Sequence, residues 1–396
     1  MRMVEWKKMW ELTAWDKKFQ GVDKSMQSKI IPYTYLLAKD LFALAVPNGN
    51  IKLLSTGVQE GWTTEELAGD YLSEGEVVTI PWGKSPGAQN PVKYYKGKFV
   101  TGDNRIATSL DTNILNNKFL YYWMYSQSDV IESFYRGAGI QHPSMFKVLT
   151  MPVPILSISE QERIVGILDT FTSSIDNLKH QIAQRRKQYE YYRCRLFSTE
   201  KWTVKKIGDL TKVFSCPRVF KDQWQDSGVP FWRSSDIMSY HNGVINPRGE
   251  VFISQSLYDE LSSKTDKIKE GDILVTGGGS IGIPYLKIDN SPLFVKDADL
   301  ICIQKCSSIV PKYLYHYFLS TDFKLYLKKI THDATIAHYT INQIKDTPIP
   351  LPSLSEQQRI VDILDKFEAS IQNLEAQLSQ REKQYEYYRN KLLTFE

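Results

Sequence analysis

The chain has 396 residues, of which 42% are hydrophobic and 24% are charged, and its formal net charge at pH 7 is only +4. This composition can build ordinary globular cores and excludes a disordered or strongly basic chain, while the small excess of cations permits a polyanionic partner. The four cysteines are too few and too irregularly spaced for a disulfide framework or a zinc site. No uncharged run approaches the ~18 residues of a membrane span, and the N-terminus lacks a secretion signal, so we expect a soluble intracellular protein.

The first globular segment, residues 1–151, opens on the phrase Lys7–Thr13, KKMWELT. A turn at 74–75 leads into aliphatic residues typical of a strand, and residues 118–123 have the pattern of a short amphipathic helix. Cations alternate with aromatic residues and glycines in its later loops, a combination that suits phosphates and base edges, although each cluster alone could be a solvated loop. The candidate DNA-binding residues here are Lys84, Lys93, Lys96, Lys98, Arg105, Arg136, His142 and Ser144.

The next region, residues 152–199, is predicted to form one long helix. Ser159 followed by Glu162 predicts the capping of its first turn, and Pro152 and Pro154 keep the preceding residues extended. A helix of about 38 residues would be about 57 Å long at about 1.5 Å per residue. Apolar and aromatic residues at alternating spacings of four and three predict a seam that packs against another helix. The seam consists of Ile164, Leu168, Phe171, Ile175, Leu178, Ile182, Arg185, Tyr189, Tyr192 and Leu196.

The second globular segment, residues 200–348, repeats landmarks of the first at 205–211, 270–274 and 312–317. The residues between these landmarks share little with the first segment. We therefore expect one fold with different surfaces. The candidate DNA-binding residues of this segment are Lys212, Arg218, Lys221, Arg233, Ser234, Ser235, Thr276, Gly278, Ser280, His338, Tyr339 and Thr340.

The last region, residues 349–396, repeats the first helix: 28 of the 46 aligned positions from Pro152 to Phe197 are identical at an offset of 196 residues. Ser355 followed by Gln358 predicts the same cap. Because the first helix ends where the second globular segment begins, and the second helix leaves that segment, the two seams can pack together only if the helices are antiparallel. The second seam consists of Ile360, Leu364, Phe367, Ile371, Leu374, Leu378, Arg381, Tyr385, Tyr388 and Leu392.

These regions predict an α+β fold with a pseudo-twofold internal repeat. Two mixed α/β domains would be separated by two long helices forming an antiparallel coiled coil, as in a dumbbell. Arg185 and Arg381 occupy seam positions, where each guanidinium could fix the register or reach out to solvent. 

Identical residues also recur outside the seam of the two helices. This recurrence reflects either a solvated face preserved by recent gene conversion or a surface that binds two copies of one partner. We favour the second interpretation and expect partner binding at Lys187, Tyr191, Arg193, Lys383, Tyr387 and Arg389.

We find no catalytic constellation and expect neither a catalytic residue nor a metal site. The loop Gly277–Gly282 follows a predicted strand but lacks the Lys-Ser/Thr pair of a P-loop, the six histidines lack metal-ligand spacing, and no Gly-x-Ser-x-Gly motif occurs. The glycine-rich turn is better suited to bring backbone amides close to a DNA phosphate.

Several phrases together resemble the specificity subunit of type I restriction-modification systems, in the order domain, helix, domain, helix and over essentially the whole chain. The first globular segment lacks a clear counterpart of the phrase at 233–236 and of the glycine-rich loop. The phrases are FWRSSDI at 231–237, GDIL at 271–274, GGGSIG at 277–282, IPLP at 349–352, SEQQRIV at 355–361 and QYEYYR at 384–389.

The resemblance implies two target recognition domains, each reading one half of a bipartite site in double-stranded DNA. The helices would fix the gap between half-sites, with a 57 Å rod spanning about 17 base pairs at about 3.4 Å each, and two methyltransferase subunits would dock on them. Those subunits would bring S-adenosylmethionine, and a restriction subunit would bring ATP and Mg²⁺. This chain would bind none of these cofactors and would work in the cytoplasm of a prokaryote.

Three functions compete: a non-catalytic DNA-reading subunit, a self-sufficient nucleic-acid-modifying enzyme, and a coiled-coil scaffold that makes only protein contacts. Unlike globular segments joined to nearly identical helices favour the first. The base sequence of either half-site depends on loop geometry and is not predictable from the chain.

Overall fold

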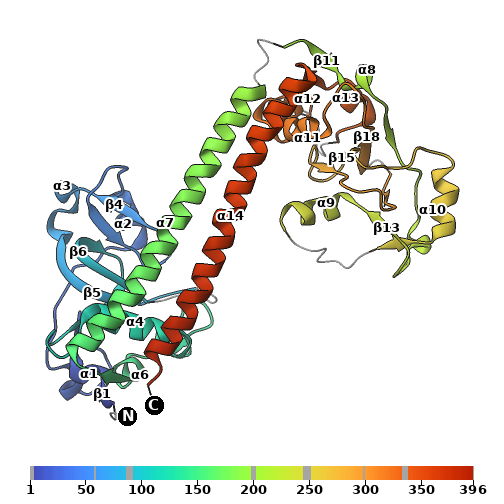
Figure 1. The fold of residues 1–396 in the computed structure, drawn as a ribbon. Helices are drawn as coiled ribbons and strands as arrows, with labels where there is room; N and C mark the ends of the chain where they lie inside the picture. Colours follow the sequence, from blue (N-terminus) through green and yellow to red (C-terminus); the bar gives the residue numbers. More distant parts are fainter. Residues whose placement is uncertain are drawn as a thin grey trace. The chain divides into compact units, whose positions relative to one another are not determined.

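We analysed a computed structural model of the chain, which describes residues 4–57, 59–85, 92–197, 202–243, 251–297, 299–331 and 338–395. It divides into two compact units (Figure 1), the first comprising Met1–Asn177 with Leu378–Glu396 and the second Leu178–Gln377. Each unit thus combines one globular domain with part of both long helices, so the division passes through the helices that the sequence set apart as regions 152–199 and 349–396.

The first unit is built on a six-stranded sheet in the order β2-β7-β5-β6-β3-β4, antiparallel except where β3 runs parallel to β6. The helix α4 buries Phe119 and Leu120 in the same core as Val78 and Ile80 of β5. The strands are β1 Glu5–Lys8, β2 Thr13–Trp15, β3 Ile51–Leu54, β4 Gly61–Thr63, β5 Ser73–Pro81, β6 Lys93–Thr101, β7 Asn104–Ser109, β8 Tyr135–Arg136, β9 His142–Pro143 and β10 Pro152–Ile155. The helices are α1 Met9–Leu12, α2 Ala38–Ala43, α3 Glu65–Ala68, α4 Asn117–Ser126, α5 Ser128–Glu132 and α6 Met145–Leu149, with 3-10 turns at Lys24–Gln27 and Gly69–Tyr71.

The second unit contains a four-stranded antiparallel sheet, β12-β18-β15-β16, and a separate three-stranded sheet, β14-β13-β17. The strands are β11 Val204–Lys206, β12 Val213–Ser215, β13 Val229–Trp232, β14 Phe252–Ile253, β15 Ile273–Thr276, β16 Pro284–Leu286, β17 Phe294–Val295, β18 Leu300–Ile303 and β19 Pro348–Pro350. The helices are α8 Ile207–Leu210, α9 Ser234–His241, α10 Gln255–Ser262, α11 Pro311–Leu319, α12 Thr321–Ile330 and α13 Ile341–Lys345, with a 3-10 turn at Lys221–Gln223.

The two units share a strand order, which confirms the predicted internal repeat. The order β2-β7-β5-β6 of the first unit corresponds to β12-β18-β15-β16 of the second, and the pair β1-β10 corresponds to β11-β19. The differences lie in the insertions: β3 and β4 extend the first sheet, whereas β13, β14 and β17 form a sheet of their own. The expected strands at 74–78 and 273–274 and the short helices at 118–123 and 312–317 are all present.

The long helices α7, Ile158–Phe197, and α14, Leu354–Leu393, pack against each other in an antiparallel sense within each unit (Figure 1). In the first unit the ring of Phe171 stacks on Tyr388, at a centroid distance of 5.3 Å. In the second unit the matching residues meet with the helices exchanged, because Tyr192 stacks on Phe367 at the same distance. This exchange of partners is what a pseudo-twofold relation between two similar helices requires.

The two seam arginines lie on aromatic rings of the opposite helix. The guanidinium carbon of Arg185 is 5.8 Å from the centre of the Phe367 ring, and that of Arg381 is 5.7 Å from the centre of the Phe171 ring. Both arginines are only partly exposed. Of the two alternatives left open by the sequence, the structure therefore favours a guanidinium held in the seam over one that reaches out to solvent.

The predicted helix caps were two residues too late. The hydroxyl of Ser157, and not that of Ser159, accepts a hydrogen bond from the Glu160 amide, and Ser353 rather than Ser355 does the same for Glu356. Each helix therefore begins earlier than expected and is 40 residues long instead of about 38. Both serines of each pair satisfy an S-x-x-Glu/Gln pattern, so spacing alone could not choose between them.

A buried glutamine ties each long helix to its globular domain. The Gln161 side chain donates to the carbonyl oxygens of Ile114 (2.8 Å) and Leu156 (3.0 Å) and accepts from the Asn116 amide (2.8 Å). Gln357 makes the corresponding hydrogen bonds in the second unit, and both side chains are fully buried.

Candidate nucleic-acid interface

In both units the end of a central strand lies beside the segment that leads into a short helix. In the first unit, backbone hydrogen bonds join Lys84, just past β5, to Gln141, and the His142 ring lies 5.0 Å from that of Trp82. In the second unit, the Tyr339 amide donates to the Gly277 carbonyl just past β15 (2.9 Å). The segments that contain His142 and His338, which correspond at an offset of 196 residues in the sequence, are thus placed at the same point of the repeated fold.

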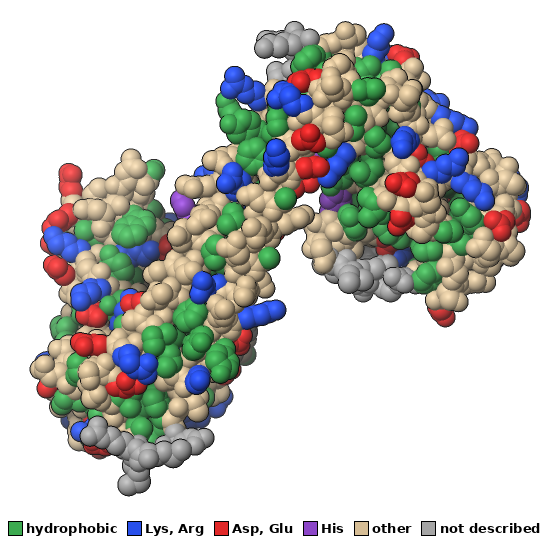
Figure 2. Space-filling model, in the orientation of Figure 1, with side chains coloured by type: hydrophobic (Ala, Val, Ile, Leu, Met, Phe, Trp, Pro, Cys, Tyr) green, Lys and Arg blue, Asp and Glu red, His purple; other side chains and the backbone are tan. Residues whose placement is uncertain are grey.

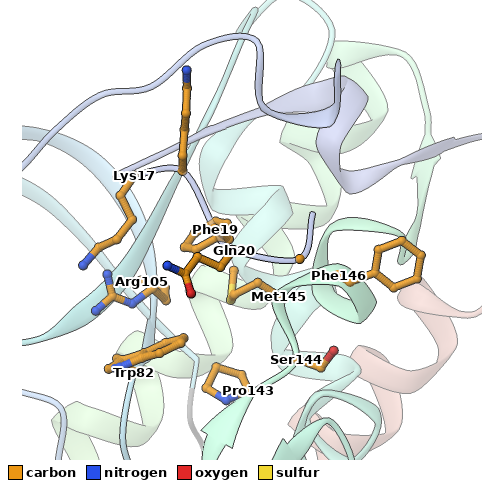
Figure 3. Close-up of a pocket in the computed structure, with 11 residues that line it drawn as sticks. Lys17, Phe19, Gln20, Trp82, Arg105, Pro143, Ser144, Met145 and Phe146 are labelled. Atoms are coloured by element: carbon orange, nitrogen blue, oxygen red, sulfur yellow. The ribbon is translucent and has the colours of Figure 1, made fainter. Parts of the chain in front are cut away.

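A hollow of about 520 Å³ opens at this point in the first unit (Figure 3). Its walls come from the segment after β2, the residue after β5, strand β7 and the start of α6. We call it the first hollow, and it is lined by residues 17–21, Trp82, Arg105 and 143–146.

Arg105 is the buried cation of the first hollow. Its side chain is 1% exposed, donates to Asp16 (2.8 Å) and to Asp103, and lies 4.8 Å from the centre of the Trp82 ring. Its Nε–H makes no hydrogen bond with the described residues. Burial raises the pKa of the Asp16 carboxyl, against the opposing hydrogen bond from the Ile106 amide and the charge of Arg105.

A hollow of about 440 Å³ lies at the corresponding place in the second unit. Its walls come from the end of β12, the residue after β15, strand β18 and the start of α13, the counterparts of the elements around the first hollow. We call it the second hollow, and it is lined by Ser215, Gly277, Ile301 and residues 338–342. Neither Lys nor Arg is among these lining residues.

Some of the predicted DNA-binding residues lie at these hollows with accessible side chains. Ser144 lines the first hollow, and the exposed His142 packs on its Trp82. His338 and Thr340 line the second hollow and are exposed. Two further predicted residues are exposed close in sequence to the lining residues: Arg136 on β8 and Ser280 in the glycine-rich loop.

Other predicted DNA-binding residues are buried or bonded within their own domain. Lys84 is buried and paired with Glu132. Tyr339 is fully buried with its hydroxyl hydrogen-bonded to Thr347, and Thr276 is fully buried and orders the loop that follows it. Gly278 is buried as well, and a Cβ at this position would lie 3.1 Å from a carboxylate oxygen of Asp299. Arg105 lines the first hollow, but its guanidinium forms ion pairs with the carboxylates of Asp16 and Asp103.

The lysines of β6 are also engaged. Lys93 donates to the carbonyl oxygens of Ser55 (2.7 Å) and Gly57, and burial lowers the pKa of its ammonium group. Lys96 pairs with Glu76 at 3.2 Å and Lys98 with Glu65 at 2.9 Å, on the exposed surface of the sheet.

The predicted residues between Lys212 and Ser235 also fall into two groups, those paired within the domain and those that remain accessible. Lys212 pairs with Asp266. Arg233 and Asp236 cap the start of α9 with a 3.0 Å ion pair, and the Ser234 hydroxyl donates to the Asp299 carbonyl. Three further predicted residues keep at least partial exposure: Arg218, Lys221 and Ser235.

Sequence reasoning missed Lys17, Lys18, Ser215 and Asn342, which line the hollows. Lys17 and Lys18 follow β2 and Ser215 ends β12, in a region where the two halves cannot be aligned. The available signal was their position shortly after the shared phrase that opens each half. Figure 2 shows Lys and Arg interspersed with Asp and Glu on the displayed face rather than gathered into one basic patch, so charge alone did not mark the site.

Some of the residues expected to bind a partner are exposed on the long helices. Tyr191 and Tyr387 are 57% and 59% exposed, and Lys187 and Lys383 are exposed as well. Arg193, also expected at this surface, is covered. It is 5% exposed, pairs with Glu190 and lies over the Tyr189 ring of its own helix at 4.8 Å.

Arg389 is partly covered in the first unit, with its guanidinium near the rings of Tyr125 and Tyr385. The outer surface common to both helices therefore comprises the tyrosine and lysine pairs, without the arginines.

One group of described side chains has metal-ligand chemistry: His316, Asp365 and Glu368, with ligand atoms within 4.8 Å of one another. Hydrogen bonds account for the group, because Asp365 accepts from His316 (3.0 Å) and Lys312 (2.8 Å), and Glu368 accepts from Tyr189 (2.7 Å).

Within the part of the chain that the structure describes, no helix is both long and apolar enough to cross a bilayer.

Comparison with known proteins decides the family. Residues 39–185 and 199–382 match the family described as "Type I restriction modification DNA specificity domain". The chain belongs to this family. It is a type I specificity subunit, the recognition component and not a catalytic one, and the scaffold and self-sufficient enzyme alternatives are not favoured.

Relatives and solved structures agree. A type I restriction enzyme specificity subunit of Haemophilus influenzae is 32% identical over 340 residues, covering 82% of this chain and 84% of the relative. The Escherichia coli EcoR124I/EcoR124II specificity subunit is 28% identical over 310 residues, covering 74% of each. The fold is similar to that of the type I S subunit from M. genitalium, with a TM-score of 0.60, 17% identity and coverage of 100% and 97% of the two chains.

Proposed function

We propose that this specificity subunit reads a bipartite site in double-stranded DNA, the first unit reading one half-site and the second unit the other. One observation carries the proposal: the same set of strands and the same short helix enclose a hollow in each unit, and the residues lining the two hollows differ in charge and size. A repeated framework with unlike linings suits the recognition of two unlike base sequences.

We propose further that two methyltransferase subunits dock on the long helices, where the exposed tyrosines and lysines recur as pairs. Identical surfaces on the two helices suit two copies of one partner. Those subunits would carry S-adenosylmethionine, and a restriction subunit would carry ATP and Mg²⁺, with none of these held by this chain. The assembly would act in the cytoplasm, where the host DNA lies.

Exchange of one globular segment tests the DNA-reading proposal. Residues 5–151 are replaced by the matching segment of the Haemophilus influenzae relative, the chain is co-expressed with its methyltransferase, and adenine methylation is mapped by long-read sequencing. We expect a motif of two short half-sites, of which only one changes in the chimera. A contiguous motif, or a change in both half-sites, would contradict the assignment of one half-site to each unit.

Tyr191→Ala and Tyr387→Ala test the docking surfaces. Native mass spectrometry of the purified complex should show two methyltransferase subunits on the original chain, one on each single variant and none on the double variant, because each substitution removes one exposed ring. Tyr71→Ala, which removes an exposed tyrosine of the 3-10 turn Gly69–Tyr71 and not of either long helix, is the control and should keep both subunits. Retention of two partners by the double variant, with unchanged circular dichroism, would reject these surfaces.

A further inference from the structure

We infer that the first hollow and the second hollow are the places where the two units contact base edges, and that their linings set the sequence of each half-site. This inference rests on the proposed function and adds to it the residues that discriminate between bases. It concerns the lining of the hollows, which includes only some of the residues that the sequence predicted: Ser144, His338 and Thr340.

The location of the hollows is the first support. Each lies between the end of the first strand of the shared sheet, β2 or β12, the end of β5 or β15, and the first turn of α6 or α13. The insertions on the two sheets differ, yet both units have an opening of similar size at this point. A site used for the same task in both units would be expected to stay in place while its lining changes.

The chemistry of the first hollow favours an edge rich in hydrogen-bond acceptors. Lys17 and Lys18 belong to its lining (Figure 3 shows Lys17), and the Lys17 ammonium lies 5.0 Å from the centre of the Tyr35 ring. The Ser144 hydroxyl makes no capping hydrogen bond at the start of α6. The nearby carboxylates of Asp16 and Asp103 are both occupied by Arg105. In the major groove the acceptor-rich edge is that of guanine, which presents O6 and N7.

The chemistry of the second hollow is different. Its polar groups are the neutral side chains of Ser215, Thr340 and Asn342 together with His338. Hydroxyl and amide groups both donate and accept, and an Asn amide fits the N6 and N7 atoms of adenine. The two hollows therefore select different bases at equivalent positions of the two half-sites.

Rigid walls support the lining residues. Arg105 is fixed by Asp16 and by the Trp82 ring in the first hollow. Tyr339 is fixed by its hydroxyl bond to Thr347 and its amide bond to Gly277 in the second. Contacts that distinguish bases need such support, because a loosely held donor meets several bases equally well.

Paired variants test the inference in the assembled methyltransferase complex. Lys17→Gln combined with Ser144→Ala alters the first hollow, and His338→Ala combined with Asn342→Ala alters the second, all at residues that are at least partly exposed. Methylation of a library of DNA duplexes, randomised in one half-site at a time, is read by sequencing. Lys39→Gln, an exposed lysine on α2 away from the hollow, is the control.

We expect each double variant to lose about tenfold or more of its discrimination at one or two positions of its own half-site, with the other half-site unchanged. A uniform fall in methylation across all sequences would show phosphate contacts instead and would overturn the inference. So would unchanged preferences in both variants while the original complex still methylates a bipartite motif. Absence of a bipartite motif in the original complex would instead refute the proposed function itself.

Discussion

Gln161 and Gln357 are the side chains on which the attachment of the long helices depends most. Each is fully buried and satisfies three main-chain groups of its own domain. A buried backbone group that loses its partner costs about 1–3 kcal/mol. We therefore expect Gln161→Leu to lower the free energy of unfolding of the first unit by at least about 2 kcal/mol, measured by urea denaturation followed by tryptophan fluorescence.

Gln188→Leu provides the matched comparison, since Gln188 is exposed on the same helix. It should change the free energy of unfolding by no more than about 0.5 kcal/mol. Equal effects of the two substitutions would mean that the buried amide does not hold the helix to the domain.

Asp365 gives the second unit a dependence on pH. Burial raises the pKa of its carboxyl, but hydrogen bonds from His316 and Lys312 outweigh this effect, so the pKa lies below its ordinary value of 3.8. Because the folded state has the lower pKa, the stabilisation is present at pH values above 3.8 and is lost as the pH falls through the folded pKa. We expect Asp365→Asn to lower the urea midpoint at pH 7, with the difference shrinking below about pH 5.

Asp362→Asn is the control for this experiment, because Asp362 is exposed one turn earlier on α14. The urea midpoint of the Asp362→Asn variant should equal that of the original chain at every pH. A difference between Asp365→Asn and the original chain that grows toward acid pH would contradict the assigned direction.

At the scale of the elements, the seam between α7 and α14 depends on aromatic packing more than on its arginines. Phe367 lies against Arg185, Tyr189 and Tyr192. Phe367→Ala should lower the free energy of unfolding by about 2 kcal/mol. This is less than the loss of about 3–5 kcal/mol on removal of a fully buried ring, because Phe367 is only partly buried.

Arg185→Leu should change the same quantity by less than about 1 kcal/mol in either direction, because the lost cation–π contact is offset by the easier burial of an aliphatic side chain. Thermal and urea unfolding of both variants compare the two contributions. A larger loss for Arg185→Leu than for Phe367→Ala would identify the guanidinium as the residue that fixes the register.

At the scale of the whole molecule, the long helices should set the gap between the half-sites. We expect that insertion of one heptad after Asn177 and another after Gln377, the points where the units divide, keeps the seam in phase and lengthens each helix by about 10 Å. The gap between the two half-sites of the methylated motif should then lengthen by about three base pairs, at about 3.4 Å each, and both half-sites should stay unchanged. Altered half-sites with an unchanged gap would contradict this role.

The fold of the helices and the repeat could be predicted because both depend on local sequence. The alternation of four and three along 164–196 and 360–392 requires only helical geometry, and the antiparallel sense follows from the order of the segments along the chain. The caps were misplaced because Ser157 and Ser159 present the same pattern. The separate sheet of the second unit could not be foreseen, since its short strands pair with residues distant in sequence.

The candidate site was predicted only in part, and the reason is electrostatic. A sequence shows which residues can carry charge but not which partners they meet, and Lys84 and Glu132, 48 positions apart, neutralise each other only in the fold. By itself the sequence determined the repeat, the helix pair and the family, because periodicity and phrase order survive in one dimension. Only the tertiary structure decided which polar side chains remain free and where the two hollows lie, because burial and pairing depend on contacts between distant segments.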